Sequence, residues 1–343
     1  MSEGRWRVLV SEPMDDIGPE SLADVADLVW YDEYADRASM GADIERFDAV
    51  IVRTFEVDRA LLDRARRLKV VAKHGAGLDN VDIEAATERG VVVCNTPDVN
   101  ARSVAEHALA MMLAVRKRLG VADADVRSGT WDRTKYVSHE LRRDVLGLFG
   151  CGAIGREVTA LAQGIGMEVV YYDPYLPADE GPAGATPIET KADLFERADA
   201  VSVHAPLTDE TRRAISAAEF DALGPNGILV NTSRGSVVNE AALVEALESE
   251  AIAGAGLDVF EHEPLDPDHP LFEVENVLVS PHVAGTTVEA LRRMSRGAAR
   301  NVRAVYEGRR PETAVNDVDA VRDDDTEETT EDAGGYDSSD ADR

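Results

Sequence analysis

The segment DVLGLFGCGAIG, from Asp144 to Gly155, runs from an apolar stretch of strand length into a glycine-rich turn. The residues that follow, REVTALAQGIG, have the pattern of a helix, and EVVYYD, which ends at Asp173, has that of a second strand. A lone GxGxxG pattern is weak evidence. Here it joins a strand to a helix and is followed by an acidic strand end, so it predicts a dinucleotide-binding unit.

Each glycine of this turn has a physical role. Gly150 permits the tight turn, Gly152 lets the backbone approach a pyrophosphate, and Gly155 lets the helix pack closely on the strand. The carboxylate of Asp173 can accept hydrogen bonds from both ribose hydroxyls of NAD and repels a 2′-phosphate. Because no Arg or Lys follows in 174–176, we expect NAD(H) rather than NADP(H).

Further short apolar runs continue the series on the C-terminal side. They are AVSVHAP (200–206), GILVNTS (227–233), GAGLDVF (254–260) and NVLVSPH (276–282). Six strand candidates with helices between them predict a doubly wound parallel sheet of the Rossmann type. On the N-terminal side, the runs 6–10, 49–53 and 70–73 predict a smaller, flavodoxin-like α/β domain, and 103–119 is the best long helix.

The last helical stretch, 289–307, follows the second series and is best explained if the chain returns to the first domain. We therefore expect a discontinuous substrate-binding domain (1–100 and 286–316) and an NAD-binding domain (101–285). Residues 317–343 are highly acidic with almost no apolar side chains, so we expect a disordered tail there.

Composition limits the class of protein. A chain of 343 residues with 44% apolar residues can form a large core. Its two cysteines and the absence of any zinc-ligand spacing favour a reduced cytoplasmic protein that holds no metal. No apolar run approaches the roughly 20 residues that span a bilayer, and no export signal is evident, so we expect a cytoplasmic location.

The net charge of −30 comes from 36 basic and 66 acidic residues, and it argues against nucleic acid and membranes as partners. Residues 317–343 hold 12 acidic and 2 basic residues, a net −10, so the rest of the chain carries −20. Only five of the basic residues are Lys and 31 are Arg. We interpret this surface as halophilic, and an acidic protein from an ordinary cell is the alternative.

Three side chains follow predicted strands and could serve hydride transfer, which needs an acid or base and a cation for a carboxylate. They are Arg234 in NTSRG, Glu263 in LDVFEHEP and His282 in SPHVAG. A histidine that faces a carboxylate can hold a proton in reduction and accept one in oxidation. Each residue alone would more often be structural, but their common position at strand ends favours a catalytic site.

The order of GxGxxG, Asp173, HAPLT (204–208), NTSRG, LDVFEHEP and SPH resembles the D-isomer-specific 2-hydroxy acid dehydrogenases. The resemblance implies that Arg234 binds the substrate carboxylate and carbonyl, that His282 is the general acid/base, and that Glu263, directly before Pro, is its carboxylate partner. The substrate is then a small anionic 2-hydroxy or 2-oxo acid. The implied cofactor contacts are Gly150, Gly152, Ala153, Ile154, Gly155, Asp173, Ala205, Pro206, Thr232 and Asp258.

The first domain carries part of the same resemblance. KHGAGLDNVD (73–82) is similar to the family loop whose backbone amides bind the substrate carboxylate, here Gly75, Ala76 and Gly77. Arg53 is similar to the family's substrate-facing arginine, and His74 is expected to pack rather than catalyse. The segment 100–113 is similar to the family's interdomain helix, which usually builds a two-fold interface, so we expect a homodimer.

Within the family, the closest resemblance is to the 3-phosphoglycerate dehydrogenases of serine biosynthesis. Arg133 and Lys135 in WDRTKY, with Arg53, would supply positive charge for a phosphorylated substrate, or the first two are exposed charges at a dimer rim. Glyoxylate or hydroxypyruvate reductase is the alternative assignment. An NAD-sensing corepressor is the alternative from another class of protein.

Overall fold

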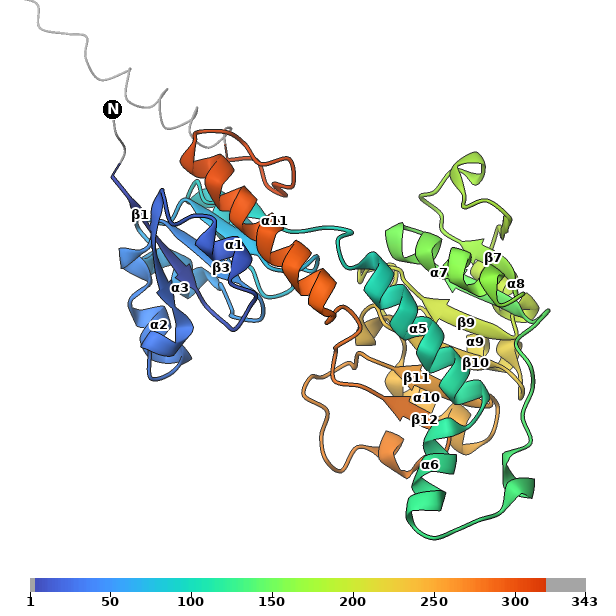
Figure 1. The fold of residues 1–343 in the computed structure, drawn as a ribbon. Helices are drawn as coiled ribbons and strands as arrows, with labels where there is room; N and C mark the ends of the chain where they lie inside the picture. Colours follow the sequence, from blue (N-terminus) through green and yellow to red (C-terminus); the bar gives the residue numbers. More distant parts are fainter. Residues whose placement is uncertain (1–3, 319–343) are drawn as a thin grey trace, which may run out of the picture. The chain divides into compact units, whose positions relative to one another are not determined.

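The computed structural model describes residues 4–318, which form two compact units. One unit contains the chain up to Val99 and again from Val288, and the other extends from Asn100 to Thr287 (Figure 1). The sequence placed these boundaries at 100/101 and 285/286. The expected tail lies outside the described residues except for Asp317 and Val318, and Val318 is buried in the core, so the packed chain extends two residues further than expected.

The unit that contains the N-terminal segment is built on a five-stranded parallel sheet. Its strands are β1 (Trp6–Val10), β2 (Ala26–Trp30), β3 (Ala49–Val52), β4 (Val70–Lys73) and β5 (Val92–Cys94), in the spatial order β2-β1-β3-β4-β5. This is the flavodoxin-like order, as expected. The sequence did not predict β2 or β5.

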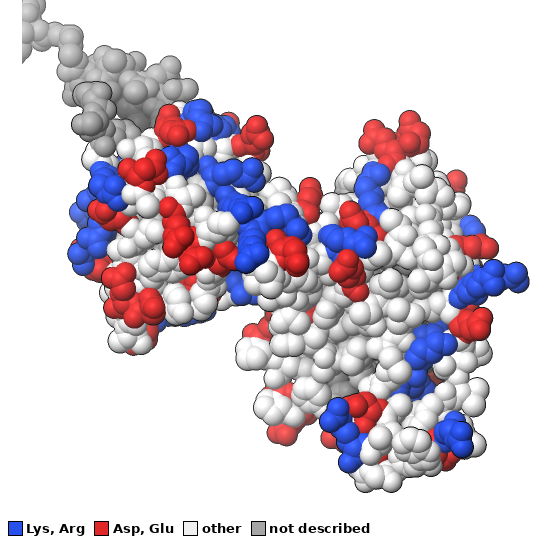
Figure 2. Space-filling model, viewed as in Figure 1, with Lys and Arg blue, Asp and Glu red and all other residues white. Residues whose placement is uncertain are grey.

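Short helices and one long helix cover the two faces of this sheet. They are α1 (Ile17–Glu20), α2 (Arg37–Ala42), α3 (Arg59–Arg64), α4 (Ile83–Glu88) and α11 (Val288–Tyr306). α11 buries small side chains such as Ala298 and Ala299, which lets it lie close to β4, and close approach of Ser295 to Gly18 joins it to α1. Its exposed face carries arginines, which gather along α11 in Figure 2.

The other unit is built on a seven-stranded parallel sheet in the order β12-β11-β10-β9-β6-β7-β8. The strands are β6 (Val145–Phe149), β7 (Glu168–Tyr172), β8 (Ala185–Pro187), β9 (Ala200–Val203), β10 (Ile228–Asn231), β11 (Gly254–Leu257) and β12 (Val277–Val279). This order is the Rossmann arrangement with one further strand at the β12 edge, which confirms the predicted fold class. The sequence missed β8, a three-residue edge strand that ends in proline.

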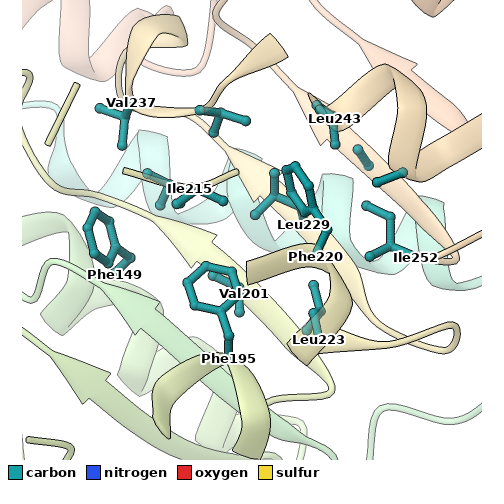
Figure 3. Close-up of a cluster of buried hydrophobic side chains, with 14 of the residues drawn as sticks. Phe149, Phe195, Val201, Ile215, Phe220, Leu223, Leu229, Val237, Leu243 and Ile252 are labelled. Atoms are coloured by element: carbon teal, nitrogen blue, oxygen red, sulfur yellow. The ribbon is translucent and has the colours of Figure 1, made fainter. Parts of the chain in front are cut away.

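Helices cover both faces of the seven-stranded sheet. They are α5 (Ala101–Arg116), α7 (Ala153–Gly164), α8 (Lys191–Arg197), α9 (Ala217–Leu223) and α10 (Glu240–Glu248), and α6 (Leu119–Arg127) follows α5 with none of its residues buried. α5 and α7 pack on one face. On the other face, Phe195 of α8 and Phe220 of α9 pack with Phe149 (Figure 3). No helix among residues 4–318 is long and apolar enough to cross a membrane.

The predicted helix 103–119 is divided in the structure. α5 ends at Arg116, and Arg118 has a left-handed backbone (φ 52°) that turns the chain into α6. In both units the parallel strands bring their C-terminal ends to one edge of the sheet, and the predicted site residues lie at these edges.

Candidate active site

The glycine turn joins β6 to α7 and leaves open space at one position. Gly150 has φ 91°, and a Cβ there would lie 2.5 Å from the backbone nitrogen of Ala205, so only glycine fits. A Cβ on Gly155 would lie 2.9 Å from the carbonyl oxygen of Gly150. At Gly152, the N-cap of α7, a Cβ would meet no described atom within 4 Å. This exposed turn can therefore admit a pyrophosphate at the helix N-terminus.

Asp173 follows β7 and is tied to the same turn. Its Oδ2 accepts a hydrogen bond from the amide of Cys151 (2.9 Å), and its Oδ1 accepts one from the amide of Tyr175 (3.0 Å). The carboxylate is therefore fixed beside the glycine turn by the backbone itself. Each oxygen retains a lone pair for a ribose hydroxyl.

The ends of β9 and β10 form the neighbouring part of the edge. The amide of Ala205 donates to the carbonyl of Phe149 (2.9 Å), and its carbonyl accepts from Ser233 Oγ (2.7 Å). Pro206 is exposed and has no amide hydrogen to donate. Thr232 is buried, and its Oγ1 has no hydrogen-bond partner within the part of the chain that the structure describes. An unpaired buried hydroxyl at this edge is suited to a polar ligand.

The structure brings Glu263 and His282 into direct contact. Nδ1 of His282 donates to Oε2 of Glu263 across 2.8 Å, and Oε1 of Glu263 accepts from the amide of Phe260 at 3.1 Å. Burial of Glu263 opposes its ionisation, but the hydrogen bond and charge of His282, the amide of Phe260 and the charge of Arg234 together outweigh burial and lower the pKa of the carboxyl. Because Nδ1 faces Glu263, Nε2 is the ring nitrogen that can exchange a proton with a ligand.

Asp258, at the end of β11, holds the turn that presents His282. Its Oδ1 accepts from the amide of Val283 (2.8 Å) and from Ser280, and its Oδ2 accepts from the amide of Ala284 (2.7 Å). His282 has φ 53°, an unfavourable left-handed backbone for a residue with a side chain. This fully buried carboxylate therefore fixes a strained turn, a structural role that the sequence did not indicate.

Arg234 follows β10 and lies near the segment that carries Glu263. Its guanidinium donates to the carbonyl of Ser233 at 2.8 Å, and its own carbonyl accepts from the side chain of Asn231 at 3.0 Å. A Cβ on the next residue, Gly235, would overlap the backbone of Phe260. This close approach brings the segments of Arg234 and Glu263 together.

A second group of charged side chains fixes the Glu263 segment from the other side. Arg213 forms a bidentate ion pair with Glu261 (2.8 and 3.1 Å). Glu261 and Glu240, the first residue of α10, each accept a hydrogen bond from the other's amide. The resemblance implied Glu263, directly before the proline, as the partner of His282. In the structure Glu263 contacts His282, whereas Glu261 pairs with Arg213.

The remaining predicted residues belong to the other unit. Arg53 follows β3, and its amide donates to Glu12. The loop 75–77 follows β4, where Gly75 (φ 146°) donates its amide to Thr96 Oγ1 (3.0 Å) and Ala76 accepts from the Asn95 side chain (2.7 Å). The Gly75 amide is therefore already used within the protein. Gly77 lies half-buried in the same loop.

The residues at the edge of the seven-stranded sheet fit an NAD molecule. The open position at Gly152 admits the pyrophosphate, the fixed carboxylate of Asp173 accepts ribose hydroxyls, and the unpaired hydroxyl of Thr232 lies further along the edge. Ala153 and Ile154 are the first two residues of α7, beneath the predicted pyrophosphate position. A direct contact of Asp258 with the cofactor stays a prediction, because the structure shows its oxygens accepting from the His282 turn.

Comparison with known proteins agrees with the family resemblance of the sequence motifs. Residues 109–284 match the family model for the D-isomer specific 2-hydroxyacid dehydrogenase NAD binding domain. The chain is 35% identical over 311 residues to a D-3-phosphoglycerate dehydrogenase of Archaeoglobus fulgidus. The matched region covers 90% of this chain but only 59% of that protein. It is 40% identical over 282 residues to a glyoxylate reductase of Thermococcus litoralis, with 80% of this chain and 85% of the relative covered.

A solved structure of similar fold is the NADPH-dependent glyoxylate/hydroxypyruvate reductase of Sinorhizobium meliloti, in complex with citrate. It is 35% identical, with a TM-score of 0.81 and coverage of 92% of this chain and 99% of that one. The chain therefore belongs to the D-isomer specific 2-hydroxyacid dehydrogenase family and carries the family's NAD-binding domain in residues 109–284.

Proposed function

We propose that this chain is an NAD-dependent dehydrogenase of D-2-hydroxy acids. The observation that carries the proposal is the 2.8 Å contact between Nδ1 of His282 and Glu263, at the same sheet edge as Arg234 and the glycine turn. A paired histidine, a cation and a dinucleotide turn at one edge match the requirements for hydride transfer to or from a hydroxy acid.

Each of these side chains has a defined task in the proposed reaction. Arg234 binds the substrate carboxylate and polarises the adjacent carbon–oxygen bond. In the oxidative direction, Nε2 of His282 accepts the hydroxyl proton, and the ionised Glu263 stabilises the resulting imidazolium. NAD, when bound, supplies the acceptor of the hydride. In the reductive direction His282 returns its proton to the carbonyl oxygen.

We propose 3-phosphoglycerate as the substrate, in a step of serine biosynthesis. The support is the similarity to the phosphoglycerate dehydrogenase of Archaeoglobus fulgidus and the cation Arg53 in the unit assigned to the substrate. Lys135 supplies less positive charge for a phosphate than the sequence predicts, because its ammonium pairs with Asp125 at 2.8 Å. Arg133 lies exposed beside it.

A second substrate class is favoured by one observation. The chain is 40% identical to the glyoxylate reductase of Thermococcus litoralis over 282 residues, and 35% identical to the phosphoglycerate dehydrogenase of Archaeoglobus fulgidus over 311 residues. Glyoxylate or hydroxypyruvate is therefore the alternative substrate.

An assay of 3-phosphoglycerate, D-glycerate, D-lactate and glyoxylate with NAD(H) and NADP(H) in molar KCl tests the proposal. We expect the highest kcat/KM for 3-phosphoglycerate with NAD. Activity on glyoxylate without activity on phosphoglycerate would replace the substrate assignment. The absence of turnover with every 2-hydroxy or 2-oxo acid would contradict the proposed function itself.

We also propose a homodimer in a halophilic cytoplasm. The exposed side chains Leu119, Val126, Trp131 and Val137 on α6 and the following segment are apolar surface that a second copy would cover. Sedimentation in molar KCl distinguishes a dimer from a monomer.

The halophilic proposal is supported by the net charge of −30 and by arginine as the main cation.

A further inference from the structure

A buried carboxylate at the edge of the five-stranded sheet was not singled out in the sequence. Glu12 lies two residues after β1 and is 6% exposed. Its Oε2 accepts hydrogen bonds from three successive backbone amides, those of Arg53 (2.6 Å), Thr54 (2.6 Å) and Phe55 (3.0 Å). Successive amides that converge on one point form an anion-binding turn. In this protein Glu12 is the anion.

The other oxygen of Glu12 is bound from the outer side. Oε1 accepts from the hydroxyl of Thr54 and from the guanidinium of Arg37 at 2.9 Å. Arg37, the first residue of α2, also donates to Thr54 Oγ1 at 2.9 Å. Burial opposes ionisation of Glu12, but the hydrogen bonds of Thr54, Phe55 and Arg53 together lower the pKa of the carboxyl. It is therefore ionised at neutral pH.

The position of Glu12 relates it to ligand binding. β1 and β3 are neighbours in the sheet. The strand order reverses between them, because β2 lies on one side of β1 and β3 lies on its other side. In open α/β sheets ligands bind outside the carboxyl ends of the strands at such a reversal. Arg53, the predicted substrate-facing cation, is the first residue after β3 at this position.

We propose that Glu12 is a positioning residue for substrate binding, which fixes the 53–55 turn so that Arg53 is held ready for an anionic substrate. This inference rests on the proposed function, since it uses the predicted role of Arg53. Glu12 binds the three amides and so fixes the backbone that carries Arg53, whose guanidinium is the proposed substrate-binding group of this turn. Preorganisation of this kind acts mainly on the affinity for the substrate.

The same sheet provides a matched control. Asp48, directly before β3, is 3% exposed and accepts from the amide of Arg7 (3.0 Å) and from Arg67 (3.0 and 3.2 Å). It is a buried carboxylate of similar environment at the opposite end of the same strands. Loss of either carboxylate weakens the unit, but only Glu12 adjoins the proposed substrate cation.

The test compares Glu12→Gln, Arg53→Gln, the double variant and Asp48→Asn by steady-state kinetics and thermal unfolding. A glutamine amide cannot accept from all of these donors. We expect Glu12→Gln to raise KM for the acid substrate about tenfold, with kcat changed less than about threefold and KM for NAD unchanged. The double variant should show no more KM increase than Arg53→Gln, because Glu12 acts through Arg53. Asp48→Asn should lower Tm and leave KM unchanged.

The outcomes separate this inference from the proposed function. If Arg53→Gln raises KM but Glu12→Gln does not, or if the two effects multiply in the double variant, Glu12 does not position Arg53 and the inference is wrong. If Arg53→Gln leaves KM unchanged in an active enzyme, the proposed role of Arg53 fails and the inference fails with it. Should Glu12→Gln not fold, Thr54→Val removes one exposed donor to Glu12, and an unchanged KM for the acid then contradicts the inference.

Discussion

The turn that carries His282 is held by both oxygens of Asp258, which accept the amides of residues 283 and 284 at 2.8 and 2.7 Å. Its left-handed backbone is thereby fixed while the ring of His282 donates to Glu263. Ser280 links the same carboxylate to His107 of α5, whose Nε2 lies 3.0 Å from the serine hydroxyl. The proposed acid/base is therefore held by Asp258 at the end of β11, by Glu263 in the following loop and, through Ser280, by α5.

Replacement of Glu263 by glutamine tests the carboxylate partner. The neutral amide cannot stabilise an imidazolium at His282, so we expect kcat/KM to fall about 100-fold at neutral pH. Glu261→Gln is the control, because Glu261 pairs with Arg213 and not with His282. Its kcat/KM should stay within about fivefold of the wild type. An equal loss in both variants would show that the segment, rather than the Glu263 carboxylate, matters.

The choice of cofactor depends on Asp173. We expect the wild type to prefer NADH over NADPH, because a fixed carboxylate repels the 2′-phosphate. Asp173→Asn keeps an acceptor for the Cys151 amide but removes the charge, so it should shift the ratio of kcat/KM values toward NADPH by about tenfold or more. Asp179→Asn, an exposed acid nearby, should leave the ratio unchanged. A wild-type preference for NADPH would refute the argument.

The half-buried His204, whose ring Nδ1 is shielded from solvent, predicts an acid-dependent loss of stability. Burial lowers the pKa of His204 to about 4, its Nε2 lies 2.8 Å from Ser202 Oγ, and its Nδ1 has no partner among the described residues. The unfolded state binds this proton near pH 6.5, so the native state has its full stability above that pH and loses it between pH 6.5 and 4. The loss from this residue is at most about 3 kcal/mol.

Urea unfolding of the wild type and of His204→Gln across this pH range measures the effect. A glutamine keeps an amide near Ser202 and does not titrate, so the variant should lose less stability than the wild type between pH 6.5 and 4. Parallel pH curves for the two proteins would show that His204 does not contribute.

The dependence of the free energy of unfolding on KCl concentration tests the interpretation of the surface charge. At 1 M salt the screening length is about 3 Å, compared with about 10 Å at 0.1 M, so most repulsion among the excess acids is removed. We expect the free energy of unfolding to rise with KCl up to molar concentration. A protein that is most stable in dilute buffer would rule out the halophilic interpretation.

The features that the sequence predicted correctly are those with a local signal. The glycine turn and the Rossmann sheet depend on contiguous motifs, and the fold class is confirmed. β2 and β5 were missed because five and three residues without clear alternation resemble any apolar stretch. The predicted long helix overran α5 because nothing in Lys117 or Arg118 marks the left-handed turn.

The contacts that support the site leave at most a weak local signal in the sequence. Glu12 binds amides 41 to 43 positions later in the chain, and Ser280 contacts a histidine 173 positions away. Such partners are determined by which strands are neighbours, so they follow only from the folded sheet. A serine or threonine near a predicted acid is the one weak signal that could have pointed to them.

The measurement that tests the proposed chemistry most directly is the turnover of His282→Ala with NADH titration and thermal unfolding alongside it. Because Nε2 of His282 is the proposed proton donor and acceptor, we predict a loss of kcat of about 10³-fold or more. Affinity for NADH and Tm should stay near the wild-type values, and His262→Ala, at an exposed neighbouring position, should keep full activity. A His282→Ala variant that retains more than about a tenth of the wild-type kcat would contradict the account.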